Sequence, residues 1–245
     1  LSTNVFWSSV SADYRNANGI DLRSHREEYG ARASVSHTTK GGLFTISANI
    51  APRIIYRDNA DWSVFRNAIE ANPTTPIMNP ENPNSYYNFQ GQVVGSNPVE
   101  LMKLEKDHAD TKLLDWDGTL KLNLLPLFMP NAKYSQNLST QVTFADHQYS
   151  NNNTWFRPST STLAINSGYD GEGSRSYSKE RQYILEWLAN YNISIKKHNI
   201  KAMAGYSYQY SQYSGFNVEN KDFPNDGLGA DNIGSGDLAK EEGEV

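Results

Sequence analysis

Residues 176–216 decide the fold of this 245-residue chain, and they read SYSKERQYILEWLANYNISIKKHNIKAMAGYSYQYSQYSGF. Apolar or aromatic side chains recur at every second position of the first half, at Tyr183, Leu185, Trp187, Ala189, Tyr191 and Ile193. A period of two predicts a strand with one apolar and one polar face. After a polar turn at residues 196–199, a second alternation ends in Tyr206, Tyr208 and Tyr210. The stretch is therefore predicted to form one long β-hairpin.

A hairpin of this length fits a membrane better than a soluble core. Soluble hairpins are usually shorter, and their apolar face must meet another layer. A strand that crosses a bilayer needs about 10 residues of alternation, apolar toward lipid and polar toward the lumen, with aromatic girdles at the interfaces. The alternative is a soluble secreted β-sandwich that binds carbohydrate, in which the same apolar faces would form a core between two sheets.

Composition excludes several classes of protein. The chain has no cysteine, so it has no disulfide framework, thiol catalysis or cysteine metal site. A net charge of -5 without a basic stripe argues against nucleic acid as a partner. No apolar run reaches the length of a membrane-spanning helix. The sequence starts at Leu1 without a charged and apolar leader, so we expect either a processed chain or a piece of a longer one.

Further alternations predict an all-β fold, an antiparallel meander of roughly seven long strands from a transmembrane β-barrel. The strands are expected at about residues 4–14, 28–39, 43–56, 113–125, 136–148, 176–195 and 199–215. Long loops are expected at residues 57–109, 149–175 and 216–245, whereas the other turns are short. Short turns at one end and long loops at the other are typical of outer-membrane barrels. Pro52, on the apolar parity, predicts a break, a bulge or a strand edge.

Two short helices are predicted inside the first long loop, which we expect to be extracellular. Trp62, Phe65 and Ile69 recur at helical spacing and are followed by Asn72-Pro73, so we expect them to form the buried stripe of a helix. Asn97 and Pro98 supply a cap and a first-turn proline for a second helix. This second helix is predicted to end at about His108.

Three stretches resemble the SusC/RagA family of TonB-dependent outer-membrane receptors. They are YRNANGIDLRSHREEYGARASVSH (residues 14–37), NPTTPIMNP (72–80) and HNIKAMAGYSYQYSQYSGFNVENKDFPND (198–226), and the resemblance covers nearly the whole chain. It implies a plugged 22-stranded barrel of the cell outer membrane that imports glycans or oligopeptides. It further implies a SusD-like lipoprotein over the outer mouth, the TonB–ExbB–ExbD system as the energy source, and contact with outer-membrane lipid.

The chain departs from this family in what it contains. The N-terminal extension, the TonB box, the plug and the last third or more of the barrel are expected to lie outside it. Roughly seven strands cannot close around a plug, so we expect a partial receptor that transports nothing alone. Its two open edges and its apolar face predict that the isolated piece, if soluble, curls into a smaller sheet structure or self-associates.

The charged residues predict no catalytic, cofactor or metal site, and no enzyme activity. Asp115 and Asp117 share one side of a strand and are interpreted as facing a watery lumen rather than as an acid–base pair. The acidic residues after 221 lack the spacing of a calcium loop, and the five histidines lack an HExxH-type motif.

Aromatic residues in the long loops are the candidates for contact with substrate or partner. They are Tyr86, Tyr87, Phe89, Trp155, Phe156 and Phe216. Exposed aromatic faces stack on sugars and anchor protein partners. The alternative for each residue is packing within its own loop.

Overall fold

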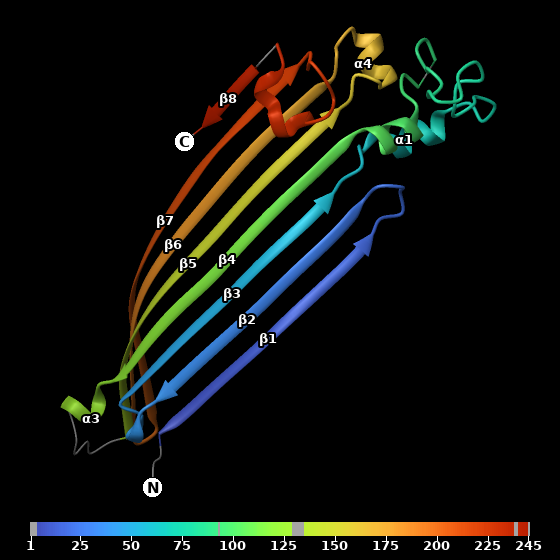
Figure 1. Cartoon of the computed structure of the whole chain (residues 1–245). Coiled ribbons are helices and arrows are strands. Elements are labelled where there is room, and N and C mark those ends of the chain that lie inside the picture. The colour runs from blue at the N-terminus through green and yellow to red at the C-terminus, as the bar shows by residue number, and fades with distance from the viewer. Residues whose placement is uncertain (1–3, 93, 129–134, 238–239, 245) are drawn as a thin grey trace.

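The computed structural model describes residues 4–92, 94–128, 135–237 and 240–244, and its strands lie side by side in one curved sheet (Figure 1). The strands are β1 (Val5–Asn18), β2 (His25–Thr38), β3 (Phe44–Asp58), β4 (Lys106–Asn123), β5 (Ser135–Arg157), β6 (Glu172–Ile195), β7 (His198–Lys221) and β8 (Lys240–Glu244). Each strand pairs antiparallel with the next in sequence order. The predicted all-β meander is confirmed, with β8 as an additional short strand at one edge.

The hairpin of β6 and β7 has the register that its alternation requires. Ile195 pairs with His198 next to the turn, and Tyr183 pairs with Tyr210 far from it. Lys196 adopts a left-handed φ of 54° in the two-residue connection, which is a conformation typical of tight hairpin turns. Because the side-chain period is two, this register places the two tyrosine-rich alternations on the same face of the sheet.

One register row shows that all seven long strands share this apolar parity. The row joins Val10, Ala33, Ile50, Trp116, Asp146, Tyr183 and Tyr210. We call the side of the sheet that carries these residues the apolar face, and the opposite side the polar face. Asp146 is the one charged member of the row, and its partners are described below.

The strands are longer than the sequence predicted, and three loop predictions are wrong in their bounds. β4 begins at Lys106, β5 continues to Arg157, and β6 already begins at Glu172. β7 continues to Lys221, and β8 forms within the predicted last loop. The reason is that the alternation marks only the apolar part of each strand. Beyond it the strands carry mostly polar residues with a few apolar ones such as Phe156 and Val218, and the backbone ladder continues without a period-two pattern. Residues 93, 129–134, 238–239 and 245, in predicted loops and turns, lie outside the described residues.

Short helices lie at both ends of the sheet. They are α1 (Ser63–Glu70), α2 (Pro98–Leu104), α3 (Leu125–Phe128), α4 (Thr162–Ser167), η1 (Lys40–Gly42) and η2 (Gly229–Ser235). α1 and α4 lie beyond one end of the strands and α3 beyond the other (Figure 1). Among the described residues, none of these helices is long and apolar enough to span a bilayer.

The structure confirms one helix start and corrects two other expectations. The Asn97 side chain caps α2 by accepting from the N–H groups of Val99 and Glu100 at 3.1 and 3.4 Å. α2 ends at Leu104 rather than near His108, because the chain there joins the ladder of β4. The predicted buried stripe of α1 is exposed instead: Trp62 is 90% and Ile69 is 84% exposed.

Pro52 interrupts one ladder of β3, as predicted. β2 pairs with β3 at Gly30 and again at Ala33, but no pairs form between them, whereas Pro52 itself keeps its place opposite Leu114 of β4. A proline has no N–H to donate, so it breaks the ladder on one side only.

The buried core lies at the loop end and leaves the apolar face uncovered. The buried apolar side chains are Ile55, Val64, Phe89, Val94, Leu101, Ala109, Phe156, Ala164, Phe223 and Ala230. Large side chains of the strands, such as Ile46, Leu185 and Trp187, are 40% exposed or more. In the described part of the chain all strands belong to one sheet, so the β-sandwich alternative, which needs two packed sheets, is wrong.

Candidate functional surfaces

An aromatic row crosses the apolar face of the seven long strands. On β1 to β3, Tyr14 contacts Tyr29 with ring centroids 5.0 Å apart, and Tyr29 contacts Tyr56 at 6.5 Å. On β4 to β7 a second line of rings, which starts six register positions away from Tyr56, passes through Trp116, Phe144, Tyr183 and Tyr210, with successive centroids 5.3, 6.1 and 6.2 Å apart. We call the two lines together the aromatic row. Rows of amphipathic rings are typical of membrane–water interfaces.

The aromatic row is oblique to the strands. On β2 the row passes through Tyr29, but the β2 residue in register with Tyr183 is Ala33, four residues further along. A row at constant height across tilted strands must shift along the register in this way. The rings of β1 to β3 are therefore displaced along the strands relative to those of β4 to β7, in the direction expected for a line of constant height across tilted strands.

The apolar band below the row has the height of a bilayer. On β6 it extends from Tyr183 to Ile193, ten residues along the strand. At about 3.3 Å per residue and a tilt of about 45°, this length spans about 25 Å, which is the height of the apolar band on a membrane barrel.

The polar face carries hydrogen bonds and ion pairs between neighbouring strands. Asp115 forms an ion pair with His147, and Asp117 accepts a hydrogen bond from Asn49 at 2.8 Å. Arg53 bridges Glu28 and Asp13. Asp115 and Asp117 therefore face the polar side, as predicted, and each has its own partner rather than forming an acid–base pair.

The loops after β3 and β5 pack into a small body that we call the loop cap, comprising residues 59–105 and 158–171. Asn97 is at its centre and is almost fully buried. Its side-chain amide donates to the carbonyls of Ile77 and Tyr87 at 2.8 and 3.3 Å, while its oxygen caps α2. One asparagine thus joins the loop before α2 to the helix.

A buried carboxylate holds α4 against α2. Glu100 is 1% exposed and accepts hydrogen bonds from the backbone N–H of Thr162, at 2.5 Å, and from the Thr162 hydroxyl. Because Thr162 is the first residue of α4, the carboxylate satisfies a donor that the helix itself leaves free. The two halves of the loop cap, 62 residues apart in sequence, are therefore connected through a buried hydrogen-bond pair.

A chain of ion pairs crosses β5, β6 and β7 below the loop cap. Arg157 lies 2.7 Å from Glu105 and 3.1 Å from Glu172, and Glu172 lies 3.0 Å from Lys221. Burial raises the pKa of Glu105 above its ordinary value, although Arg157 opposes the shift. These pairs connect the upper ends of the three strands, next to the small apolar cluster of Phe156, Phe223 and Ala230.

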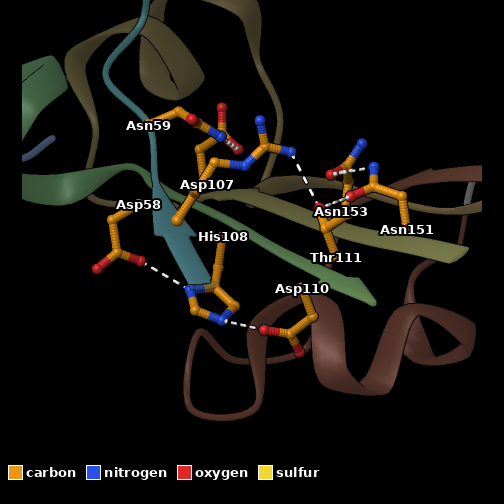
Figure 2. A network of polar contacts seen from close by, with 9 residues as sticks. Asp58, Asn59, Asp107, His108, Asp110, Thr111, Asn151 and Asn153 are labelled. Carbon is orange, nitrogen blue, oxygen red and sulfur yellow. Dashed lines mark hydrogen bonds and ion pairs between the residues drawn. The ribbon is translucent and has the colours of Figure 1, made fainter. Parts of the chain in front are cut away.

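His108 lies between two carboxylates on the apolar parity, well above the aromatic row. Its Nδ1 is 2.7 Å from Asp58 and its Nε2 is 2.9 Å from Asp110 (Figure 2). Partial burial lowers the pKa of His108, but the bonds to Asp58 and Asp110 outweigh it and leave the pKa above the ordinary value of 6.5. Among the described residues, no cluster of three or more histidine, cysteine or acidic side chains is arranged to hold a metal ion.

The six predicted contact residues fall into three separate places. Tyr86, Tyr87 and Phe89 lie together in the loop cap, where Phe89 is buried and its ring centroid is 6.1 Å from that of Tyr87. Trp155 and Phe156 lie in β5 rather than in a loop.

The two β5 aromatics have opposite environments, and Phe216 is separate from both. Arg157 covers Trp155 at 4.9 Å, while Phe156 is buried against Phe223. Phe216 lies in β7 and is 46% exposed, with its centroid 6.1 Å from that of Tyr177. Phe89 and Phe156 therefore offer no free ring face. Contact through Tyr86, Tyr87, Trp155 or Phe216 stays a prediction.

Comparison with solved structures finds the same architecture in a known importer. The chain matches "the RagAB peptide importer in the 'closed-closed' state" with a TM-score of 0.66 and 14% identity, and its 'open-open' state with 0.66 and 12%. It matches "the RagAB peptide transporter" with 0.60 and 15%. The chain shares the fold of part of RagAB. The matches cover 98 to 99% of this chain and 27% of each RagAB chain, so it spans about a quarter of their length. No family model and no curated protein matches the sequence.

The sequence reasoning missed two groups of residues. The amide of Asn97 joins distant parts of the loop cap, and no local pattern indicates the carbonyls it meets. A set of cations at Lys112, Lys179 and Arg181 shares the parity of the apolar residues, just above the aromatic row. Assigning each charged residue of a predicted strand to the apolar or the polar face would have identified this second group.

Proposed function

We propose that this chain forms seven neighbouring strands in the wall of an outer-membrane importer of the SusC/RagA type. The observation that carries the proposal is the continuous apolar band of bilayer height, bounded by an aromatic row and opposed by a polar face. Packing as a soluble domain would leave large side chains such as Trp187 and Tyr206, which are 43% and 62% exposed, in water. Lipid covers such a band in a membrane barrel.

Oligopeptides are the first cargo to test, and glycans the second. The sequence resemblance allows both classes, and the likeness to RagAB structures, which are named as peptide importers, supports peptides.

The decisive experiment uses the full-length receptor that contains this chain. We expect it to need detergent for extraction and, with its lipoprotein, to bind fluorescent oligopeptides more tightly than oligosaccharides. Uptake by whole cells should stop when the TonB system is removed. Extraction into buffer without detergent would contradict the proposal, and exclusive binding of oligosaccharides would replace peptides with glycans as the cargo.

A SusD-like lipoprotein over the outer mouth is the proposed partner, and the exposed face of α1 supports it. Trp62 and Ile69 on this helix are 90% and 84% exposed among the residues that the structure describes. Exposed apolar residues of this size often anchor protein interfaces. We expect Trp62→Ser with Ile69→Ser to weaken lipoprotein co-purification by tenfold or more. Arg66→Ser with Glu70→Ser, which removes an exposed ion pair on the same helix, is the matched control. Equal loss in both pairs would exclude α1 as the anchor.

A further inference from the structure

A cationic cluster lies on the apolar parity of β4 to β6, directly above the aromatic row. Lys112, Ser150 and Lys179 occupy one register row across the three strands. Arg181 is the next residue of the same parity on β6, between Lys179 and Tyr183. Both lysines are exposed, and among the described residues neither forms an ion pair. We call Lys112, Ser150, Lys179 and Arg181 the cationic cluster.

The cluster lies at the depth of lipid phosphates. Each further residue of the same parity is about 6.6 Å along the strand, or about 5 Å in height at a tilt of about 45°. Arg181 is thus about 5 Å and Lys179 about 9 Å above Tyr183. Polar headgroups occupy about the first 5 to 8 Å beyond the hydrocarbon on each side of a bilayer. Arg181 lies in this layer, and the long flexible side chain of Lys179 reaches it from just above. Lys112 is four residues above Trp116 on β4, as Lys179 is four residues above Tyr183 on β6, so the two lysines lie at a similar distance above the row.

Charge on β6 is sorted by face. Its cations, Arg175, Lys179 and Arg181, share the apolar parity, whereas its carboxylates, Glu172, Glu180 and Glu186, have the opposite parity. The whole chain carries a net charge of -5, so a general excess of basic residues does not explain the cluster. Two carboxylates of the apolar parity lie near the cluster: Asp146 of β5 pairs with Arg181, and Asp110 of β4 bonds to His108, so the two lysines keep their charge without an ion pair among the described residues. The cluster is therefore a local positive surface aimed at the lipid side.

Arg181 is held in a fixed position at the lower edge of the cluster. Its Nε and one terminal nitrogen donate to buried Asp146 at 3.1 and 3.0 Å, and Trp116 donates to the same carboxylate at 3.0 Å. The guanidinium lies 4.5 Å from the Tyr183 ring centroid. Arginine has five N–H donors, so donors remain for a second anion. The lysines provide two further charges on either side of the Ser150 hydroxyl, about 10 Å apart across two strand spacings.

An apolar hollow adjoins the cluster on its membrane side. Phe144, Tyr183, Leu185, Tyr208 and Tyr210 line this open hollow of about 500 Å³. Four of its five lining residues are aromatic, and Tyr183 also lies under Arg181. A hollow of apolar rings below a set of cations matches a molecule with a hydrocarbon chain and an anionic head.

We propose that the cationic cluster and this hollow bind a phosphorylated acyl lipid of the surrounding leaflet, with phosphate at Lys112, Lys179 and Arg181 and one acyl chain in the hollow. The proposal rests on the membrane location proposed above. Each cation near a membrane surface contributes attraction to anionic headgroups, and Arg and Lys are the usual partners of phosphate. A fixed arginine and a shaped apolar slot add selectivity for one lipid over the bulk.

The test uses the purified full-length receptor in detergent and measures binding of fluorescent lipid A before and after phosphatase treatment. Lys112→Gln with Lys179→Gln should bind phosphorylated lipid A about 10- to 30-fold more weakly. Lys112→Arg with Lys179→Arg should keep the affinity. Lys121→Gln with Lys201→Gln removes the same charge from the polar face and should change affinity less than twofold.

The outcomes separate this proposal from the proposed function. Wild-type receptor that is found in the membrane fraction but binds treated and untreated lipid A equally would overturn the lipid site alone. Wild-type receptor absent from the membrane fraction would overturn both. If the double glutamine variant does not assemble, each single variant should weaken binding about three- to fivefold. Unchanged binding in both single variants would overturn the lipid site.

Discussion

The loop cap and the sheet of β1 to β7, which we call the strand wall, are stabilised in different ways. The cap is held by side chains that bury one another: Asn97 and Glu100 are each 1% exposed and fully hydrogen-bonded. The wall has almost no buried apolar residue along its strands and is held by backbone ladders, while its large rings are exposed. The cap therefore buries its own core, whereas the apolar face of the wall must be covered by the surrounding medium. Substitutions should act through packing and hydrogen bonds in the cap, and through the environment in the wall.

The largest expected effect comes from a charge on the apolar face of the strand wall. Ala189→Arg places a charge near the middle of the apolar band and should cost about 2–4 kcal/mol of folding free energy in the membrane. Leu185→Arg, one residue of the same parity below Tyr183, should cost less because the penalty falls toward the interface. The folded fraction of full-length receptor, measured by heat-dependent gel migration, checks both variants.

The neighbouring residue provides the control for this substitution. Asn190 follows Ala189 on β6 and has the opposite parity, so Asn190→Arg should assemble normally. An equal loss of folded receptor in Ala189→Arg and Asn190→Arg would mean that both faces of the strand are in the same environment.

A second substitution should destabilise the loop cap without changing the stability of the strand wall. Asn97→Ala removes the cap of α2 and the donors to Ile77 and Tyr87 and should cost about 2–3 kcal/mol locally. Asn97→Asp keeps the capping oxygen but loses both donors and buries a charge, so it should not restore stability. Hydrogen exchange in residues 77–104 of the full-length receptor measures the effect, with the exposed Asn84→Ala as control. Faster exchange along β6 as well would contradict the independence of cap and wall.

The smallest expected effect is a pH-dependent contribution of His108, which lies where the strand wall meets the loop cap. His108 joins the end of β3 to β4, and its raised pKa means that the protonated form stabilises the folded state. This contribution is complete below about pH 6.5 and is lost as the pH rises through the higher folded value. Because the ion pairs are half exposed, we expect it to be at most about 1 kcal/mol.

Thermal unfolding of the full-length receptor between pH 5.5 and 8.5 measures this contribution. His108→Gln should flatten the fall in stability with rising pH, whereas His198→Gln, in the exposed turn at the opposite end of the sheet, should leave it unchanged. A profile unaffected by His108→Gln would exclude the link.

The sequence predicted the wall well because alternation reports directly which side chains share a face. The apolar parities of residues 44–54 and 183–193 correspond to one continuous face in the structure. It failed where both faces have the same chemistry. Residues 150–154 and 172–176 are polar on both sides, and only pairing with neighbouring strands shows that they are strands.

The cap was predicted less well, because its contacts join residues distant in sequence. The spacing of Trp62, Phe65 and Ile69 correctly indicated a helix, but amphipathic spacing does not reveal what covers the apolar side. The cap at Asn97 was readable because capping is local. Its bonds to Ile77 and Tyr87 were not, because they depend on how a proline-rich loop folds back.

The unequal reach of the strands past the aromatic row gives the rim a slope. β6 continues eleven residues beyond Tyr183, to Glu172, which is about 25 Å in height, whereas β1 continues four residues beyond Tyr14, about 9 Å. If the sheet forms part of a barrel wall, as proposed above, the rim is higher over β5 to β7 than over β1 and β2. A molecule from outside would then reach the polar face over the shorter distance at β1 and β2.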